Sequence, residues 1–146
     1  MNLKGKNALI TGGGRGLGKA VAIAFANEGV NVGITGRNEE HLKSTVTDLE
    51  KLGVKAVYSV FNVDEMAQVE QGVASIASQL GGIDILINNA GVGDFGSFED
   101  MPVETWEKVM KVNLFGVYYV AKAALPYIKQ NKEGDIVNVA STAGLK

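Results

Sequence analysis

A glycine-rich string near the start of the chain, Thr11-Gly-Gly-Gly-Arg-Gly-Leu-Gly18, has the residue types that bind phosphate. Glycine leaves the backbone N–H groups of a turn uncovered, so a bulky and highly charged phosphate can approach them. The string follows an apolar run and opens an amphipathic segment, whose helical N-terminus would direct further N–H groups at the anion. No Lys-Ser/Thr pair follows the last glycine, which excludes a P-loop. We predict a dinucleotide-binding loop, the alternative being an ordinary turn, with these binding residues: Gly12, Gly14, Arg15, Gly16, Leu17 and Gly18.

Two arginines indicate which dinucleotide the loop would bind. A site for NAD usually places a carboxylate at the end of the second strand, about 20 residues after the loop, where it accepts from a ribose hydroxyl. Here Gly36 and Arg37 stand at that place, and Arg15 lies in the loop on the same side. A guanidinium can bind a 2′-phosphate through two hydrogen bonds, whereas a carboxylate would repel it. The pattern favours NADPH (NADP+) over NADH; the alternative is that Arg37 merely ends the strand in solvent.

Short apolar runs alternate with longer amphipathic segments, and together these must position the loop. Strands are expected at residues 7–11, 31–36, 55–61, 83–87 and 135–140. Helices are expected at residues 15–28, at 39–52 with Asn38 as N-cap and Gly53 as stop, at 64–80 with Asp64 as cap, and from Pro102 in the first turn to about residue 130. The strands are apolar on both faces, as a parallel sheet covered by helices on both sides requires. We predict an α/β, doubly wound parallel (Rossmann) sheet with strand order 3-2-1-4-5 and a ligand crevice at its carboxyl edge.

The composition excludes several other classes of protein. The 146 residues are 46% hydrophobic and 21% charged with 2 prolines, which excludes a disordered or proline-rich chain. The formal net charge is −2 without a basic stripe, so we expect no binding to nucleic acid. The absence of cysteine and the single histidine, His41, exclude disulfides and multi-histidine metal sites. No apolar stretch approaches the ~20 residues that span a bilayer, so we expect a cytoplasmic protein without a membrane partner.

The loop and three further motifs make this chain similar to the classical short-chain dehydrogenase/reductase family. The spacing of the loop is T-G-x-x-x-G-x-G, formed by Thr11, Gly12, Gly16 and Gly18. In the order found in the family, the other motifs then follow: Asn88-Asn89-Ala90-Gly91 after the fourth strand, Asn113 in the long helix, and Ser141 at the end of the fifth strand. Within the family the chain is most similar to the 3-oxoacyl-[acyl-carrier-protein] reductase group.

The resemblance implies a role for each motif. Asn62 and Val63 would border the adenine, although family members often have Asp in place of Asn62. Three residues after the fourth strand would lie against the adenosine ribose, or alternatively form a polar turn: Asn89, Ala90 and Gly91. Ser141 would donate a hydrogen bond to the substrate carbonyl, on whose oxygen negative charge develops during reduction. Asn113 would support the catalytic lysine of the family through water.

The general acid of the family is a tyrosine with a lysine four residues later, a dozen or so residues beyond the serine, and this sequence stops at Lys146. Tyr118 and Lys122 share that spacing but precede Ser141 inside the long helix, so we interpret them as surface residues or subunit contacts. We therefore expect residues 1–146 to form a dinucleotide-binding domain, the N-terminal part of a reductase whose C-terminal elements are missing. The fifth strand would then be an exposed apolar edge that favours self-association, in line with the homo-oligomers of the family.

Three smaller expectations concern single residues or loops. His41 is expected to be exposed near a helix start, and Trp106 and Met110 to share the buried face of the long helix. The glycine-rich segment 93–99 is expected either to line the substrate site or to be a plain surface loop.

The sequence is compatible with three functions. The first is NADPH-dependent reduction of a ketone, a small molecule or a 3-oxoacyl thioester on an acyl carrier, by the complete parent protein. Ser141 and Asn113, which a pure binder would not need, favour it. The second is a non-catalytic NADP(H)-binding or sensing module, which the absent Tyr/Lys pair favours. The third is an α/β domain without a ligand.

Overall fold

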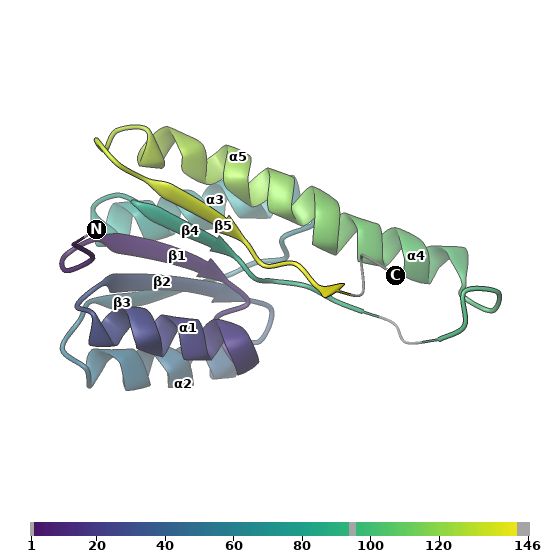
Figure 1. Ribbon diagram of the computed structural model, residues 1–146, viewed down its shortest axis with the longest axis horizontal. Helices are drawn as coiled ribbons and strands as arrows, with labels where there is room; N and C mark the ends of the chain where they lie inside the picture. The colour runs from purple at the N-terminus through teal and green to yellow at the C-terminus, as the bar shows by residue number, and fades with distance from the viewer. Residues whose placement is uncertain (1, 94–95, 143–146) are drawn as a thin grey trace.

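Five parallel strands form one sheet in a computed structural model of the chain, which describes residues 2–93 and 96–142 (Figure 1). The strands run in the order β3-β2-β1-β4-β5, which confirms the predicted topology. Each is short and ends at the same edge of the sheet, because all neighbouring pairs are parallel. Their bounds are β1 Asn7–Thr11, β2 Asn31–Gly36, β3 Ala56–Val60, β4 Ile85–Asn88 and β5 Asp135–Asn138.

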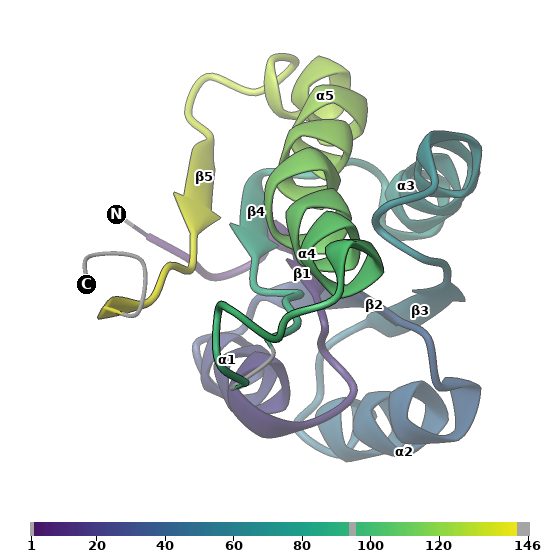
Figure 2. The ribbon, with the colours of Figure 1, turned by 90° about the vertical axis from the view of Figure 1, so that its right-hand side faces the viewer.

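Helices cover both faces of the sheet (Figure 2). One face packs against α1 and α2, and the other packs against α3 and α5. Neighbouring residues of β1 show the division, because Ile10 belongs to the core below α1 and α2 while Leu9 belongs to the core below α3 and α5. The bounds are α1 Gly16–Asn27, α2 Glu39–Glu50, α3 Met66–Leu80, α4 Val103–Met110 and α5 Gly116–Ile128.

Helix starts follow the predictions with two exceptions. Asn38 caps α2 as predicted, because its Oδ1 accepts a hydrogen bond of 3.0 Å from the backbone N–H of His41. The N-cap of α3 is Glu65, not Asp64, and its side chain makes no capping hydrogen bond. Pro102 is the N-cap of α4 and lies just outside the first turn in which it was expected.

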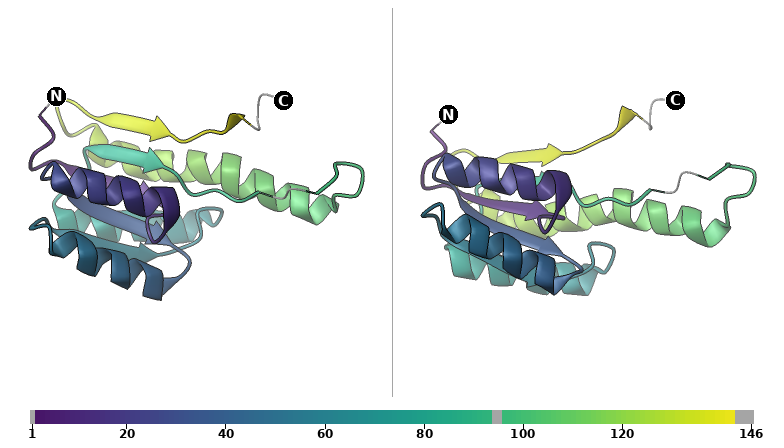
Figure 3. Two further views of the ribbon diagram at one scale, coloured as in Figure 1. Left: turned by 60° about the horizontal axis from the view of Figure 1, so that its bottom comes forward. Right: turned by 90° about the horizontal axis from the view of Figure 1, so that it is seen from below.

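The long helix is interrupted by a π-helical turn, η1 (Lys111–Phe115), between α4 and α5. The amphipathic pattern did not predict this turn, because a π-bulge inserts one residue into a helix without ending the helix. The expected burial of Trp106 is wrong, since its side chain is 49% exposed and no residue of α4 is buried. The reason is that α4 extends beyond the carboxyl ends of the strands (Figure 3), where the described part of the chain offers it no sheet to pack against.

The apolar edge predicted for the fifth strand is present. Among the described residues, β5 pairs with β4 alone. Two apolar residues of β5, Ile136 and Val137, and one just after it, Val139, have exposed side chains. Among residues 2–93 and 96–142, none of the helices combines the length and apolar character that a bilayer crossing demands.

Candidate functional site

A cleft of about 680 Å³ opens at the carboxyl ends of β1, β2, β3 and β4. The loop after each of these strands contributes to its wall, and the helix that follows β4 closes one end. The cleft brings together every residue that was predicted to contact the cofactor: Gly12, Gly14, Arg15, Gly16, Leu17, Gly18, Arg37, Asn62, Val63, Asn89, Ala90 and Gly91. Their binding roles stay predictions, but the topology explains why residues so far apart in the sequence meet here.

The loop after β1 needs glycine for two separate physical reasons. Gly12 and Gly16 have φ angles of 69° and 54°, a region that other residues adopt at a cost. Gly18 is helical, but a Cβ at this position would collide with the carbonyl oxygen of Gly12 and lie 2.6 Å from Nδ2 of Asn89. The spacing of the glycines therefore lets α1 begin directly against the turn.

Thr11 and Asn89 fasten this loop to the end of β4. The hydroxyl oxygen of Thr11 accepts hydrogen bonds of 2.9 Å from the backbone N–H groups of Asn89 and Ala90. In return, Nδ2 of Asn89 donates a hydrogen bond of 2.9 Å to the carbonyl oxygen of Thr11. The amide nitrogen of Asn89 thus positions the loop, a role that the resemblance to a ribose-binding residue did not predict.

Replacing Thr11 by valine is expected to lower the free energy of unfolding by about 2–3 kcal/mol, because two backbone donors lose their acceptor at a buried position. Urea unfolding of the purified protein measures the change. Thr11→Ser keeps the oxygen and is expected to lose less than about 1 kcal/mol. Thr47→Val serves as the matched control, since the hydroxyl of Thr47 bonds a helix carbonyl at the exposed surface. Equal stability of Thr11→Val and Thr47→Val would contradict the role given to Thr11.

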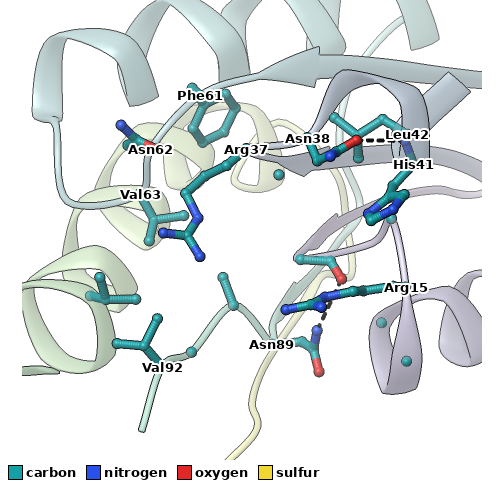
Figure 4. Close-up of a pocket in the computed structure, with 18 of the residues that line it drawn as sticks. Arg15, Arg37, Asn38, His41, Leu42, Phe61, Asn62, Val63, Asn89 and Val92 are labelled. Carbon is teal, nitrogen blue, oxygen red and sulfur yellow. Dashed lines mark hydrogen bonds between the residues drawn. The ribbon is translucent and has the colours of Figure 1, made fainter. Parts of the chain in front are cut away.

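Two guanidinium groups extend into the cleft from different elements (Figure 4). Arg15 is the N-cap residue of α1 and Arg37 follows the end of β2, and both side chains are exposed. Within the described residues, neither guanidinium forms an ion pair with a carboxylate. Among the described cleft residues Asp64 is the one acid, and it lies on the loop after β3. The end of the cleft at β2 is therefore positively charged.

Apolar side chains form the wall beyond Arg37. Phe61 is buried beneath the loop after β3, and Val63 and Val112 line the cleft from that loop and from η1. The backbone N–H of Asn62 donates to Oε1 of Gln68 at 3.1 Å, which fixes this loop against the start of α3. The sequence did not indicate that η1 and α4 contribute to this wall, because they belong to a different segment of the chain from the loop after β3.

Asn113 lies in the π-helical turn and pairs with the backbone of Val92. Its Oδ1 accepts a hydrogen bond of 2.9 Å from the N–H of Val92, and its Nδ2 donates one of 2.7 Å to the carbonyl oxygen of the same residue. The pair ties the loop after β4 to the helix that closes the cleft. The unusual position of an asparagine inside a helix was visible in the sequence, but its partner was not.

The remaining predicted residues lie outside the cleft or at its rim. Ser141 is exposed beyond the end of β5 and is not one of the cleft residues. Tyr118 is 57% exposed, and the ammonium of Lys122 lies 5.8 Å from the centre of its ring, so the structure places this pair on the surface of α5. His41 is exposed, as predicted, but it also lines the cleft.

Residues 94 and 95 of the segment 93–99, and residues 143–146, lie outside the described residues. In the part of the chain that is described, no three histidine or acidic side chains gather in a way that could hold a metal ion.

Comparisons with protein-family models and with curated proteins agree on the family that this chain resembles. A model of the short chain dehydrogenase family matches residues 6–146. The 3-oxoacyl-[acyl-carrier-protein] reductase FabG of Thermotoga maritima is 39% identical over 145 residues, which are 99% of this chain and 59% of that protein. The D-beta-hydroxybutyrate dehydrogenase of Cupriavidus necator is 35% identical over 143 residues, 98% of this chain and 55% of that protein. The chain therefore spans less than two thirds of the length of these relatives.

Solved structures with the same fold include proteins bound to either nicotinamide dinucleotide. The crystal structure of NAD+-bound xylitol dehydrogenase matches with a TM-score of 0.95 and 34% identity, over 100% of this chain and 56% of that one. A short chain dehydrogenase from Burkholderia cenocepacia in complex with NADP matches with a TM-score of 0.93 and 33% identity, over 100% of this chain and 59% of that one.

Proposed function

The chain belongs to the short chain dehydrogenase family, and from that premise we propose that its cleft binds NADPH for the reduction of a ketone. The observation that carries the choice of cofactor is the pair Arg15 and Arg37 at an end of the cleft without a carboxylate. Solved structures with this fold hold NAD+ in one case and NADP in another, so the preference depends on this chain's own residues. A carboxylate after β2 would favour NADH.

The residues of the cleft fit such a cofactor. A volume of about 680 Å³ lies within the ~300–1,000 Å³ range of small-molecule and cofactor sites. Gly18 has no room for a Cβ, so α1 begins directly against the loop, and its first N–H groups, which have no partner within the helix, suit a pyrophosphate there. Val63 and Val112 offer apolar walls for an adenine ring, and Asn62 lies beside them with an amide that can accept from its amino group.

Each group of residues would then perform one task. The loop amides hold the pyrophosphate, and Arg15 and Arg37 form charge-assisted hydrogen bonds with the 2′-phosphate. Ala90 and Gly91 border the ribose, while Asn89 and Asn113 act as positioning residues through the backbone of Thr11 and Val92. When bound, the reduced nicotinamide supplies the hydride. Ser141 donates a hydrogen bond to the carbonyl oxygen on which negative charge develops.

The substrate class proposed for the whole protein is a 3-oxoacyl thioester or a similar ketone, supported by the identity to 3-oxoacyl-[acyl-carrier-protein] reductase. The chain covers 59% of the length of that relative, so the reduction is proposed for the whole protein, and cofactor binding is the part of it that these 146 residues can test. A second candidate for the whole protein is a non-catalytic NADP(H)-binding module. Ketone reduction by a version of the protein with the full length of its relatives supports the first candidate, and NADPH binding without reduction at that length supports the second.

The experiment that tests the cofactor is a pair of fluorescence titrations with NADPH and NADH. NADPH is expected to bind at least about tenfold more tightly, because a 2′-phosphate adds charge-assisted hydrogen bonds of roughly 1.5–3 kcal/mol each. Equal affinities, or tighter binding of NADH, would contradict the proposed preference and leave the dinucleotide site itself standing.

We also propose that the protein forms a homo-oligomer. The support is the exposed apolar surface of β5 and of the long helix, where the large side chains are Trp106, Leu114, Phe115 and Tyr118.

A further inference from the structure

We propose that His41 is a third residue that recognises the 2′-phosphate, beside Arg15 and Arg37, and that its contribution increases as the pH falls. This inference rests on the proposed NADPH site. His41 was interpreted from the sequence as an ordinary exposed residue, and its exposure is confirmed. The sequence did not indicate the direction in which the His41 side chain faces.

The first turns of α2 separate their charged residues by face. Glu39 and Lys43, four residues apart, pair with each other on the side of β3, where the Tyr58 hydroxyl donates a hydrogen bond of 3.0 Å to Glu39. The Tyr58 hydroxyl, followed by the Lys43 ammonium, holds the pKa of the Glu39 carboxyl below its usual value. Glu40 also pairs with Lys43, at 3.7 Å. Both acids at the start of α2 are thus paired with Lys43.

The opposite side of α2 faces the glycine loop. Thr45 donates a hydrogen bond of 3.2 Å to the carbonyl oxygen of Gly14, and a Cβ on Gly14 would lie 3.1 Å from the Cβ of His41. The helix therefore approaches the loop so closely that Gly14 leaves just enough room for His41. His41, Asn38 and Leu42 all line the cleft. In Figure 4 the imidazole of His41 points from α2 toward Arg15.

The charged surroundings of His41 suit an anion on this side of the cleft. Arg15 approaches from the loop and Arg37 from the end of β2, while Asp64 lines the cleft from the loop after β3. In its own helical turn, Glu39 and Glu40 share the ammonium of Lys43, so these three groups together add a single negative charge against the two guanidinium groups. An imidazole is the side chain whose charge ordinarily changes between pH 5 and 8. A phosphate would attract the protonated imidazole much more strongly than the neutral one. The uncharged ribose hydroxyl of NADH would interact with the two forms of the ring almost equally.

The test measures dissociation constants for NADPH and NADH at pH 6.0 and pH 8.5, for the unchanged protein, His41→Gln, His41→Lys and the control Lys132→Gln. Comparing variants at the same pH removes the effect of the phosphate's own proton, which dissociates near pH 6. His41→Gln is expected to weaken NADPH binding about fivefold at pH 6.0, the size of one exposed charge pair, and by less than about 1.5-fold at pH 8.5. NADH binding should change at neither pH. His41→Lys should keep tight NADPH binding at both pH values, and Lys132→Gln, at an exposed position that does not line the cleft, should match the unchanged protein.

Each other outcome has a definite meaning. If His41→Gln leaves NADPH binding unchanged at pH 6.0, or weakens it equally at both pH values, the inference is overturned while the NADPH site stands. If the variant weakens NADH and NADPH alike, His41 acts on the shape of the loop and not on the phosphate, which also overturns it. If the unchanged protein binds NADPH no more tightly than NADH, both the proposed preference and the inference fail. Thermal unfolding of each variant confirms that the exposed substitutions leave the fold intact.

Discussion

Replacing Arg37 by aspartate is expected to weaken NADPH binding by about 100-fold or more and to leave NADH binding unchanged or tighter. The side chain extends into the cleft just after β2 and has no carboxylate partner among the described residues. Its removal costs a charge-assisted contact of roughly 1.5–3 kcal/mol, and the new carboxylate adds repulsion against the 2′-phosphate. The same carboxylate can accept a hydrogen bond from the ribose hydroxyl of NADH.

Titration of both cofactors by fluorescence measures this change as a ratio of dissociation constants. Lys132→Asp introduces the same change of charge at an exposed position that does not line the cleft, and it should leave the ratio within about twofold of the unchanged protein. Arg37→Gln should lie between the two. If Arg37→Asp lowers both affinities equally, Arg37 does not distinguish the cofactors and the preference must come from elsewhere.

Replacing Gly18 by alanine is expected to weaken binding of both NADPH and NADH by about 100-fold, the equivalent of losing one or two charge-assisted hydrogen bonds. The new Cβ would collide with the backbone of Gly12, which cannot swing aside as a long side chain would. The loop and the start of α1 must separate, and the backbone N–H groups then no longer converge on one phosphate. The same overpacking should lower the free energy of unfolding by about 1–3 kcal/mol.

Gly81→Ala separates the effect on binding from the effect on stability. Gly81 has a φ of 87° at the C-terminus of α3, with no atom within 4 Å of the added Cβ, so its replacement costs roughly 1–2 kcal/mol of backbone strain far from the cleft. Calorimetry should show both variants destabilised by a similar amount, and titration should show weakened binding for Gly18→Ala alone. Unchanged cofactor affinity in Gly18→Ala would refute the proposed binding loop.

Much of the fold could be predicted because it depends on local patterns. Apolar runs of five or six residues at 7–11 and 31–36 are strands in the structure with the same bounds. Asn38 is a helix cap because its side chain reaches a backbone N–H only three residues away. The order of the strands then follows from right-handed crossovers between parallel strands, a rule that holds with few exceptions.

The errors concern residues whose environment is set by distant segments. Trp106 has the spacing of a buried helix residue, but its burial depends on whether a sheet lies beneath that turn, and α4 extends past the sheet. Asn89 lines the cleft as its motif predicts, but the sequence did not indicate that its amide nitrogen also bonds the backbone of a strand 78 residues earlier. The hydrogen bonds between Asn113 and Val92 could not be predicted, since they join residues 21 positions apart.

By itself the sequence determined the alternation of strands and helices, the glycine loop and the two arginines that follow two of the strands. These features depend on backbone preferences and periodicity within a few residues, and they bring the loops to one edge of the sheet. The tertiary structure alone decided how each cleft residue is used. Asn89 and Asn113 bind backbone, the two acids in the first turn of α2 pair with Lys43, and His41 faces the loop. Those assignments require distances between segments that approach each other only after the sheet has formed, because hydrogen bonds and ion pairs act over a few ångströms.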